Sequence, residues 1–117
     1  MAITSIRHYR GDTWLRSWVI KDATGAPVDL TGASARLHVR PQEGTDNADE
    51  LILAASVGSG LNITAGAGRV DLRVEAADMA ALAIGVYRFD LEVTFVDGVV
   101  RTIEQGRIMI IEDVARD

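Results

Sequence analysis

The sequence predicts an all-β fold, an immunoglobulin-like antiparallel β-sandwich of about seven to eight strands with one short helical crossover. Apolar and polar residues alternate over residues 86–96, which is the period of two of a strand with one buried face. Asp97-Gly98 joins this segment to a second apolar run at 99–103, and this dipeptide favours a hairpin with a type I′ turn. Glycine-rich turns and the lack of a sustained helical period favour two packed sheets, with a closed barrel as the main alternative.

The composition indicates one folded domain over residues 1–117. An apolar fraction of 48% argues against disorder. The absence of cysteine excludes a disulfide framework, a thiolate metal site and a cysteine nucleophile. A net charge of −5 argues against nucleic acid as a partner, because phosphate binding needs a clustered basic surface. The chain shows no signal pattern and no apolar run of membrane length, so we expect no membrane partner and a cytoplasmic location on synthesis.

The first part of the chain reads as a series of strands. Residues 3–10 form an edge strand, and residues 13–21 form a second strand with Trp14 and Trp18 on one face. Arg16 interrupts that apolar face, although a long arginine can bury its stem and keep its charged head in water. The same alternation predicts further strands over residues 35–40, 61–63 and 69–74, whereas residues 51–57 form a short apolar segment whose pattern does not fix which side faces inward.

A helical crossover precedes the long strand at 86–96. Residues 76–82 are good helix formers in a segment too short to be stable alone, so we expect one or two turns that cross between the sheets. Tyr87 lies at the start of the next strand, two residues before Phe89. This layout fits a tyrosine corner, in which the hydroxyl is bonded to the backbone of the crossover. Tyr87 and Phe89 are therefore predicted to be structural residues.

The last strand changes phase between Ile103 and Ile108, which predicts a β-bulge near residues 105–106. After the bulge, Met109 and Ile111 place apolar side chains outward on a terminal strand that we expect to have an unpaired edge. Such an edge can accept another strand, from a second copy or from another protein. The predicted interface residues are Ile3, Ile6, Met109 and Ile111.

No catalytic, cofactor or metal site is recognisable, so we expect a protein that is not an enzyme and that carries no cofactor. His8 and His38 are far apart and each lies beside an arginine in a strand, which favours surface positions. The acidic segment 46–50 could gather oxygen ligands around Ca²⁺, but its spacing differs from that of an EF-hand loop. A solvated acidic loop is the favoured interpretation.

Trp14 and Trp18 allow two interpretations. Two tryptophans on one strand face can form a stacking platform for sugars, as carbohydrate-binding sandwiches use. Burial between the two sheets explains the same spacing more simply, and we favour it. Trp14 and Trp18 are therefore predicted to be structural core residues.

Six short segments together resemble small structural proteins of tailed phages and prophages, and in particular the immunoglobulin-like N-terminal domain of baseplate upper proteins. The segments are 10–13, 21–25, 27–32, 35–40, 85–87 and 104–107. They consist of turn and strand residues, so the resemblance concerns the fold family more than a ligand. It implies a structural module of the virion.

The function expected from this resemblance is a non-catalytic assembly module of a phage or prophage tail, of baseplate type, that acts through protein–protein contacts. Its partners would be other tail proteins, with homo-oligomers also expected, and its final location would be the virion. The alternative is a carbohydrate- or receptor-binding β-sandwich module, which would need Trp14 and Trp18 to be exposed.

Overall fold

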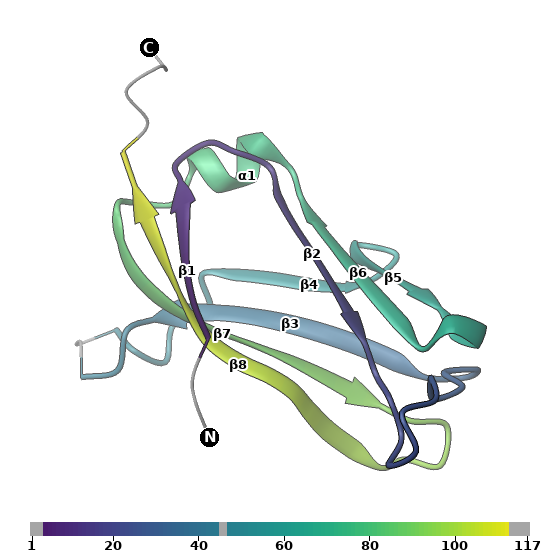
Figure 1. Cartoon of the computed structure of the whole chain (residues 1–117). Helices are drawn as coiled ribbons and strands as arrows, with labels where there is room; N and C mark the ends of the chain where they lie inside the picture. The colour runs from purple at the N-terminus through teal and green to yellow at the C-terminus, as the bar shows by residue number, and fades with distance from the viewer. Residues whose placement is uncertain (1–3, 45–46, 113–117) are drawn as a thin grey trace.

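The computed structural model describes residues 4–44 and 47–112 and contains eight strands, one short helix and one 3₁₀ turn (Figure 1). The strands are β1 (Thr4–Tyr9), β2 (Trp14–Val19), β3 (Ser34–Pro41), β4 (Leu53–Val57), β5 (Gly60–Thr64), β6 (Arg69–Val74), β7 (Gly85–Thr94) and β8 (Val100–Ile111). The 3₁₀ turn η1 is Ala65–Ala67, and the helix α1 is Ala76–Ala80. None of the helices in these ranges is long and apolar enough to cross a membrane.

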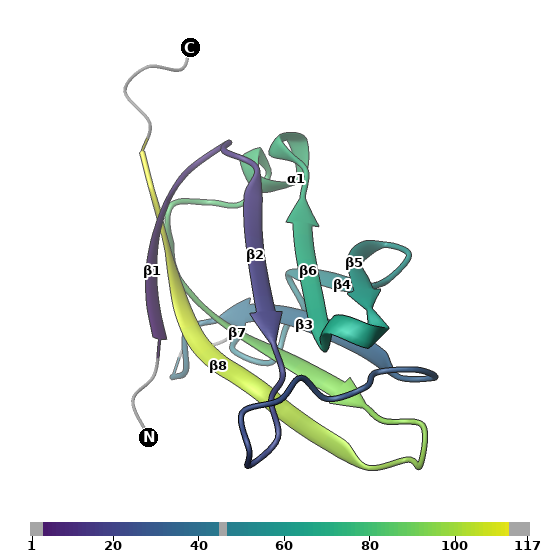
Figure 2. The ribbon, with the colours of Figure 1, turned by 45° about the vertical axis from the view of Figure 1, so that its right-hand side comes forward.

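The strands follow the order β1-β8-β7-β3-β4-β5-β6-β2, and the two halves of this sheet face each other. β4 links the halves, because it pairs antiparallel with β3 and parallel with β5. In Figure 2, β2 and β6 stand opposite β1 and β8, with α1 at one end of the sandwich. The hydrogen-bonded order begins at β1 and ends at β2, so the sheet is not a closed barrel over the described residues. The predicted all-β, immunoglobulin-like sandwich is confirmed.

The core lies between the two layers and is filled by alternate residues of the strands. Trp14 and Trp18 from β2 are buried, as is Phe89 from β7. The rings of Trp14 and Phe89 meet edge to face at 5.4 Å between centroids, a favoured aromatic geometry. Leu37, Leu91 and Ile108 are fully buried in the facing sheet. Burial of this apolar area is the main force that holds the two layers together.

The hairpin between β7 and β8 forms as predicted, but its turn differs from the expected type. Gly98 has a φ of 89°, whereas Asp97 does not have a positive φ. The amide of Phe95 donates to the carbonyl of Val99 at 2.8 Å, and the amide of Gly98 donates to the carbonyl of Phe95 at 2.9 Å. This is a three-residue loop that needs left-handed backbone only at glycine, not the two-residue type I′ turn.

The last strand is not an edge strand, so the expectation of an unpaired edge beside Met109 and Ile111 is wrong. β8 pairs antiparallel with β7 and parallel with β1, and Thr4 lies opposite Gly106 in the parallel ladder. Alternation in the local sequence identifies β8 as a strand but does not show which distant strand pairs with it. β1 pairs with the edge of β8 that we expected to be unpaired. The free edges of the described sheet belong to β1 and β2.

The bulge also lies elsewhere than predicted. The register changes between Leu91, opposite Glu104, and Glu92, opposite Thr102, which leaves Ile103 as the extra residue. Because the bulge precedes residue 104, Glu104 falls on the inward side of β8 with Ile108.

Tyr87 begins β7 and forms the bond expected of a tyrosine corner. Its hydroxyl donates to the carbonyl of Ala83 at 2.7 Å, which ties the strand to the end of the crossover. The ring is half-buried rather than fully buried. Burial raises the pKa of the Tyr87 phenol, although the bond to Ala83 opposes that rise.

Candidate functional site

The outer face of the β3-β7-β8 layer carries three arginines side by side. Arg40 of β3 lies opposite Arg88 of β7, and Arg88 lies opposite Arg107 of β8. We call these three residues the arginine row. Alternation along each strand places them outward, away from the buried Val39, Phe89 and Ile108. Like charges directly opposite one another destabilise a sheet, so this row has an energetic cost that packing does not explain.

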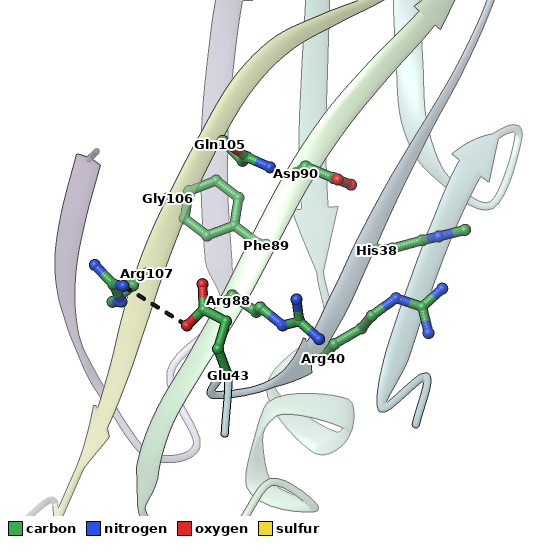
Figure 3. A pocket seen from close by; sticks show the side chains of 9 residues that line it. All are labelled: His38, Arg40, Glu43, Arg88, Phe89, Asp90, Gln105, Gly106 and Arg107. Atoms are coloured by element: carbon green, nitrogen blue, oxygen red, sulfur yellow. Dashed lines mark ion pairs between the residues drawn. The ribbon is translucent and has the colours of Figure 1, made fainter. Parts of the chain in front are cut away.

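The arginine row borders a hollow of about 160 Å³. In Figure 3 the guanidinium group of Arg88 lies beside the stem of Arg40, whose own guanidinium group extends away from Glu43, and Arg107 lies on the far side of Glu43. Polar side chains of a second row also line the hollow. The nine lining residues are His38, Arg40, Glu43, Arg88, Phe89, Asp90, Gln105, Gly106 and Arg107.

Backbone carbonyls hold two of the three guanidinium groups in place. Arg88 donates from Nε to the carbonyl of Pro41 at 3.0 Å and from Nη2 to the carbonyl of Ala48 at 2.5 Å. Arg40 donates from Nη1 to the carbonyl of Asp49 at 2.6 Å. A carbonyl oxygen orients a guanidinium but brings no formal charge to neutralise it. The arginines are therefore fixed in position while much of their positive charge remains.

The carboxylates near the row are too loosely placed to cancel that charge. Asp49 Oδ1 lies 3.8 Å from Nη2 of Arg88, and the Asp49 side chain is fully exposed. Glu43 Oε2 lies 3.6 Å from Nη2 of Arg107, and both of those side chains are exposed. Exposed ion pairs at such distances contribute little to stability.

The carboxylate of Glu43 lies beside the arginine row. In Figure 3 its carboxylate points into the space between Arg107 and Arg88. A hydrogen bond to its own backbone, followed by the charges of Arg107 and Arg88, lowers the pKa of Glu43 below its ordinary value despite partial desolvation. The charges of Arg107 and Arg88 thus add to the stronger effect of the backbone hydrogen bond in favouring the ionised carboxylate.

A row that consists of a histidine, an aspartate and a glutamine lies one step along the same strands. His38 of β3 is opposite Asp90 of β7, which is opposite Gln105 of β8. The lining thus sets three guanidinium groups against the carboxylates of Glu43 and Asp90. This excess of positive over negative charge suits one negative charge in a ligand better than several. The N–H donors of the guanidinium groups also suit a planar carboxylate, which arginine can bind with two parallel hydrogen bonds.

The structure separates most of the residues that the sequence analysis singled out. Trp14 and Trp18 are buried, so a sugar platform at these rings is ruled out, and the indole of Trp18 donates to Glu104 at 3.0 Å. His8 lies on β1 and its Nε2 is 2.9 Å from the carbonyl of Asp12, while His38 lies on β3 at the hollow. Within residues 4–44 and 47–112, no group of three or more His, Asp or Glu could hold a metal ion.

The acidic loop forms no cation site in its described part. Asn47 donates from its side-chain amide to Glu50 at 3.1 Å, and the side chain of Asp49 projects into solvent. Asp46 lies outside the described residues. The loop instead supplies the carbonyls of Ala48 and Asp49 that hold the arginine row.

Two of the predicted interface residues, Met109 and Ile111, lie on the same outer face as the arginine row. Met109 is exposed and Ile111 is half-buried on β8. Ile6 points inward and packs against the core instead. Ile3 lies outside the described residues. The arginine row itself was missed, because its members are separated in sequence and only the strand register brings them together.

Comparisons with known proteins show the fold alone. No family model matches the sequence, and no curated protein matches it. Among solved structures, the fold is similar to that of CopC from Methylosinus trichosporium OB3b, with a TM-score of 0.54 and 14% identity. The alignment covers 97% of this chain and 89% of that chain. At this identity the similarity carries no function across.

These comparisons overturn the resemblance to phage baseplate proteins. The matching fold is that of CopC, and neither a family model nor a curated protein supports a phage origin. The predicted identity as a phage or prophage tail protein is therefore wrong, and so is the tail-assembly function that it implied. The error arose because the matched segments are turn and strand residues, which many unrelated sandwiches share.

Proposed function

We propose that this domain is a non-catalytic binding module that takes up a carboxylate group of another molecule at the arginine row. The observation that carries the proposal is the register of Arg40, Arg88 and Arg107 on three neighbouring strands. Such a row costs stability unless an anion offsets the repulsion. The chain as a whole has a net charge of −5, whereas the arginine row concentrates positive charge at one place.

The geometry favours a small singly charged group over a polyanion. The hollow of about 160 Å³ admits a carboxylate but not a long chain. Glu43 and Asp90 on its lining would repel a second and third negative charge. The overall negative charge of the chain further disfavours nucleic acid.

Titration with sodium acetate, followed through backbone amide shifts at constant ionic strength, tests the proposal. Arg88→Met keeps the length of the stem and removes two anchored donors and the charge. Arg101→Met, at the start of β8 opposite Val93, removes an exposed arginine away from the hollow and serves as the matched control. We expect Arg88→Met to weaken acetate binding at least about tenfold and Arg101→Met to leave it unchanged.

Two results would overturn the proposal. Equal acetate affinity in the wild type, Arg88→Met and Arg101→Met would remove the arginine row from the site. Saturable binding of inorganic phosphate at least tenfold tighter than that of acetate would replace the carboxylate with a different anion.

A further inference from the structure

The arginine row continues into an apolar area on the same outer face. One step along the strands, Val86 of β7 lies opposite Met109 of β8, and Met109 lies opposite Arg7 of β1. One step further, Ile111 of β8 lies opposite Tyr9 of β1. Met109 and Tyr9 are exposed. We call Val86, Met109, Ile111 and Tyr9 the apolar rows.

The spacing of these rows is that of an extended chain. Arg107, Met109 and Ile111 follow each other at every second residue of β8, so neighbouring rows are about 6.6 Å apart. An extended peptide also presents side chains on one face at every second residue, about 6.6 Å apart. A peptide laid along β8 can therefore place a carboxylate at the arginine row and two apolar side chains at the apolar rows.

We propose that the natural ligand of this face is an extended segment of another protein that carries an acidic residue followed by apolar residues two and four positions later. This inference rests on the proposed function, since it takes the carboxylate at the arginine row as its anchor. Exposed Met109 lies one row from Arg107 on β8, and exposed Tyr9 lies one row further along on β1, so charged and apolar side chains follow each other on this face. A ligand that matches both parts buries apolar area that acetate cannot reach.

A second copy of this chain fits the face less well. In a twofold contact the same surface patch meets itself, so a dimer centred on this face would bring two arginine rows together. Six guanidinium groups in one contact would repel each other unless anions separated them. A partner of different sequence with an acidic residue avoids that repulsion.

The probe is the peptide acetyl-Gly-Asp-Ser-Leu-Ser-Leu-Gly-amide, compared with acetate on the same protein. A control peptide of the same composition, acetyl-Gly-Asp-Leu-Ser-Leu-Ser-Gly-amide, puts its leucines on the opposite face from the aspartate. We expect the probe to bind at least about tenfold more tightly than acetate, and the control peptide to bind within about twofold of acetate.

Protein variants separate this inference from the proposed function. Met109→Ser removes an apolar contact one row away from the arginines, and Val99→Ser removes an exposed valine at the hairpin tip as the matched control. We expect Met109→Ser to lower the peptide affinity at least about threefold while the acetate affinity stays unchanged. Val99→Ser should change neither affinity.

Several outcomes would overturn the inference while leaving carboxylate binding in place. One is equal affinity of the probe peptide, the control peptide and acetate. Another is concentration-dependent dimerisation of the wild type in light scattering that Met109→Ser abolishes, which would make a second copy the occupant. A third outcome is that Arg88→Met loses acetate binding, Met109→Ser keeps it, and the probe peptide binds no more tightly than acetate. That result would confirm the anion site alone.

Discussion

Arg16 of β2 and Glu104 of β8 form a bidentate ion pair between the two layers of the sandwich, with Nε to Oε1 at 2.7 Å and Nη2 to Oε2 at 2.8 Å. Thr4 and the indole of Trp18 also donate to Glu104. The guanidinium of Arg16 lies 5.7 Å from the ring centre of Trp18, a cation–π distance. The pair therefore connects β1, β2 and β8 beside the open edges of the sheet.

Removing both members of this pair should destabilise the fold by less than the sum of the two single losses. The side chains of Arg16 and Glu104 are only 28% and 18% exposed, so either one left alone is a poorly solvated charge. We expect Glu104→Leu and Arg16→Leu each to lower the free energy of unfolding by about 2–4 kcal/mol. The double variant should lose less than the sum by about 1–3 kcal/mol. Urea unfolding of the four proteins measures this coupling, and additive losses would show that the pair is energetically unimportant.

The same carboxylate should make stability depend on acidity. Burial alone would raise the pKa of Glu104, but bonds from Arg16, Trp18 and Thr4 and the charge of Arg16 outweigh it and lower the pKa below its ordinary value. A lowered folded-state pKa gives stability that is fully present above the unfolded pKa of about 4.3 and lost as pH falls through the folded value. The stability gap between the wild type and Glu104→Gln should be constant from about pH 5 to 8 and shrink toward pH 3. A gap that stays the same at pH 3 would contradict this assignment.

Gly106 should resist substitution because β1 and Phe89 approach its backbone closely. A Cβ built there would lie 2.8 Å from the Thr4 carbonyl oxygen and 2.8 Å from the Phe89 ring. We expect Gly106→Ala to cost about 1–3 kcal/mol and to speed hydrogen exchange in β1. Gly66→Ala is the control, since nothing lies within 4 Å of its Cβ position, and its unfolding midpoint should stay near that of the wild type. Identical midpoints for the two variants would refute close packing at Gly106.

Glu43 should compete with added carboxylates for the arginine row. Its Oε2 already lies 3.6 Å from Arg107, so a ligand must displace it or share the positive charge with it. We expect Glu43→Gln to bind acetate about twofold to fivefold more tightly than the wild type, because the amide brings no negative charge. The comparison uses backbone amide titrations of both proteins. Weaker binding by Glu43→Gln would mean that Glu43 supports the ligand instead of competing with it.

Local alternation predicted the strands well because each strand has one buried and one solvated face. The strand pattern at 86–96, the crossover at 76–82 and the bond of Tyr87 to the preceding backbone depend on neighbouring residues only. The parallel pairing of β1 with β8 depends on residues about 100 positions apart, and alternation carries no information about that partner.

The same limit explains why the charged residues were misread. Arg16 interrupts the apolar pattern of its strand, and the sequence does not explain this because its partner Glu104 is distant along the chain. Glu104 turns inward only because the bulge lies at Ile103, whereas the phase change alone suggested residues 105–106. The arginine row depends on two registers at once, β3 with β7 and β7 with β8. Each arginine alone reads as an ordinary outward-facing residue.

An acetate titration of the wild type, followed through the side-chain ¹H–¹⁵N resonances of the arginines, shows directly whether the arginine row binds a carboxylate. Arg36 and Arg73 are internal references, since they pair with Glu92 and Glu75 elsewhere on the surface. We predict that the Nε–H signals of Arg40, Arg88 and Arg107 shift together and saturate, while those of Arg36 and Arg73 stay nearly constant. Shifts that are linear in acetate concentration and similar for all five arginines would contradict a carboxylate site at the arginine row.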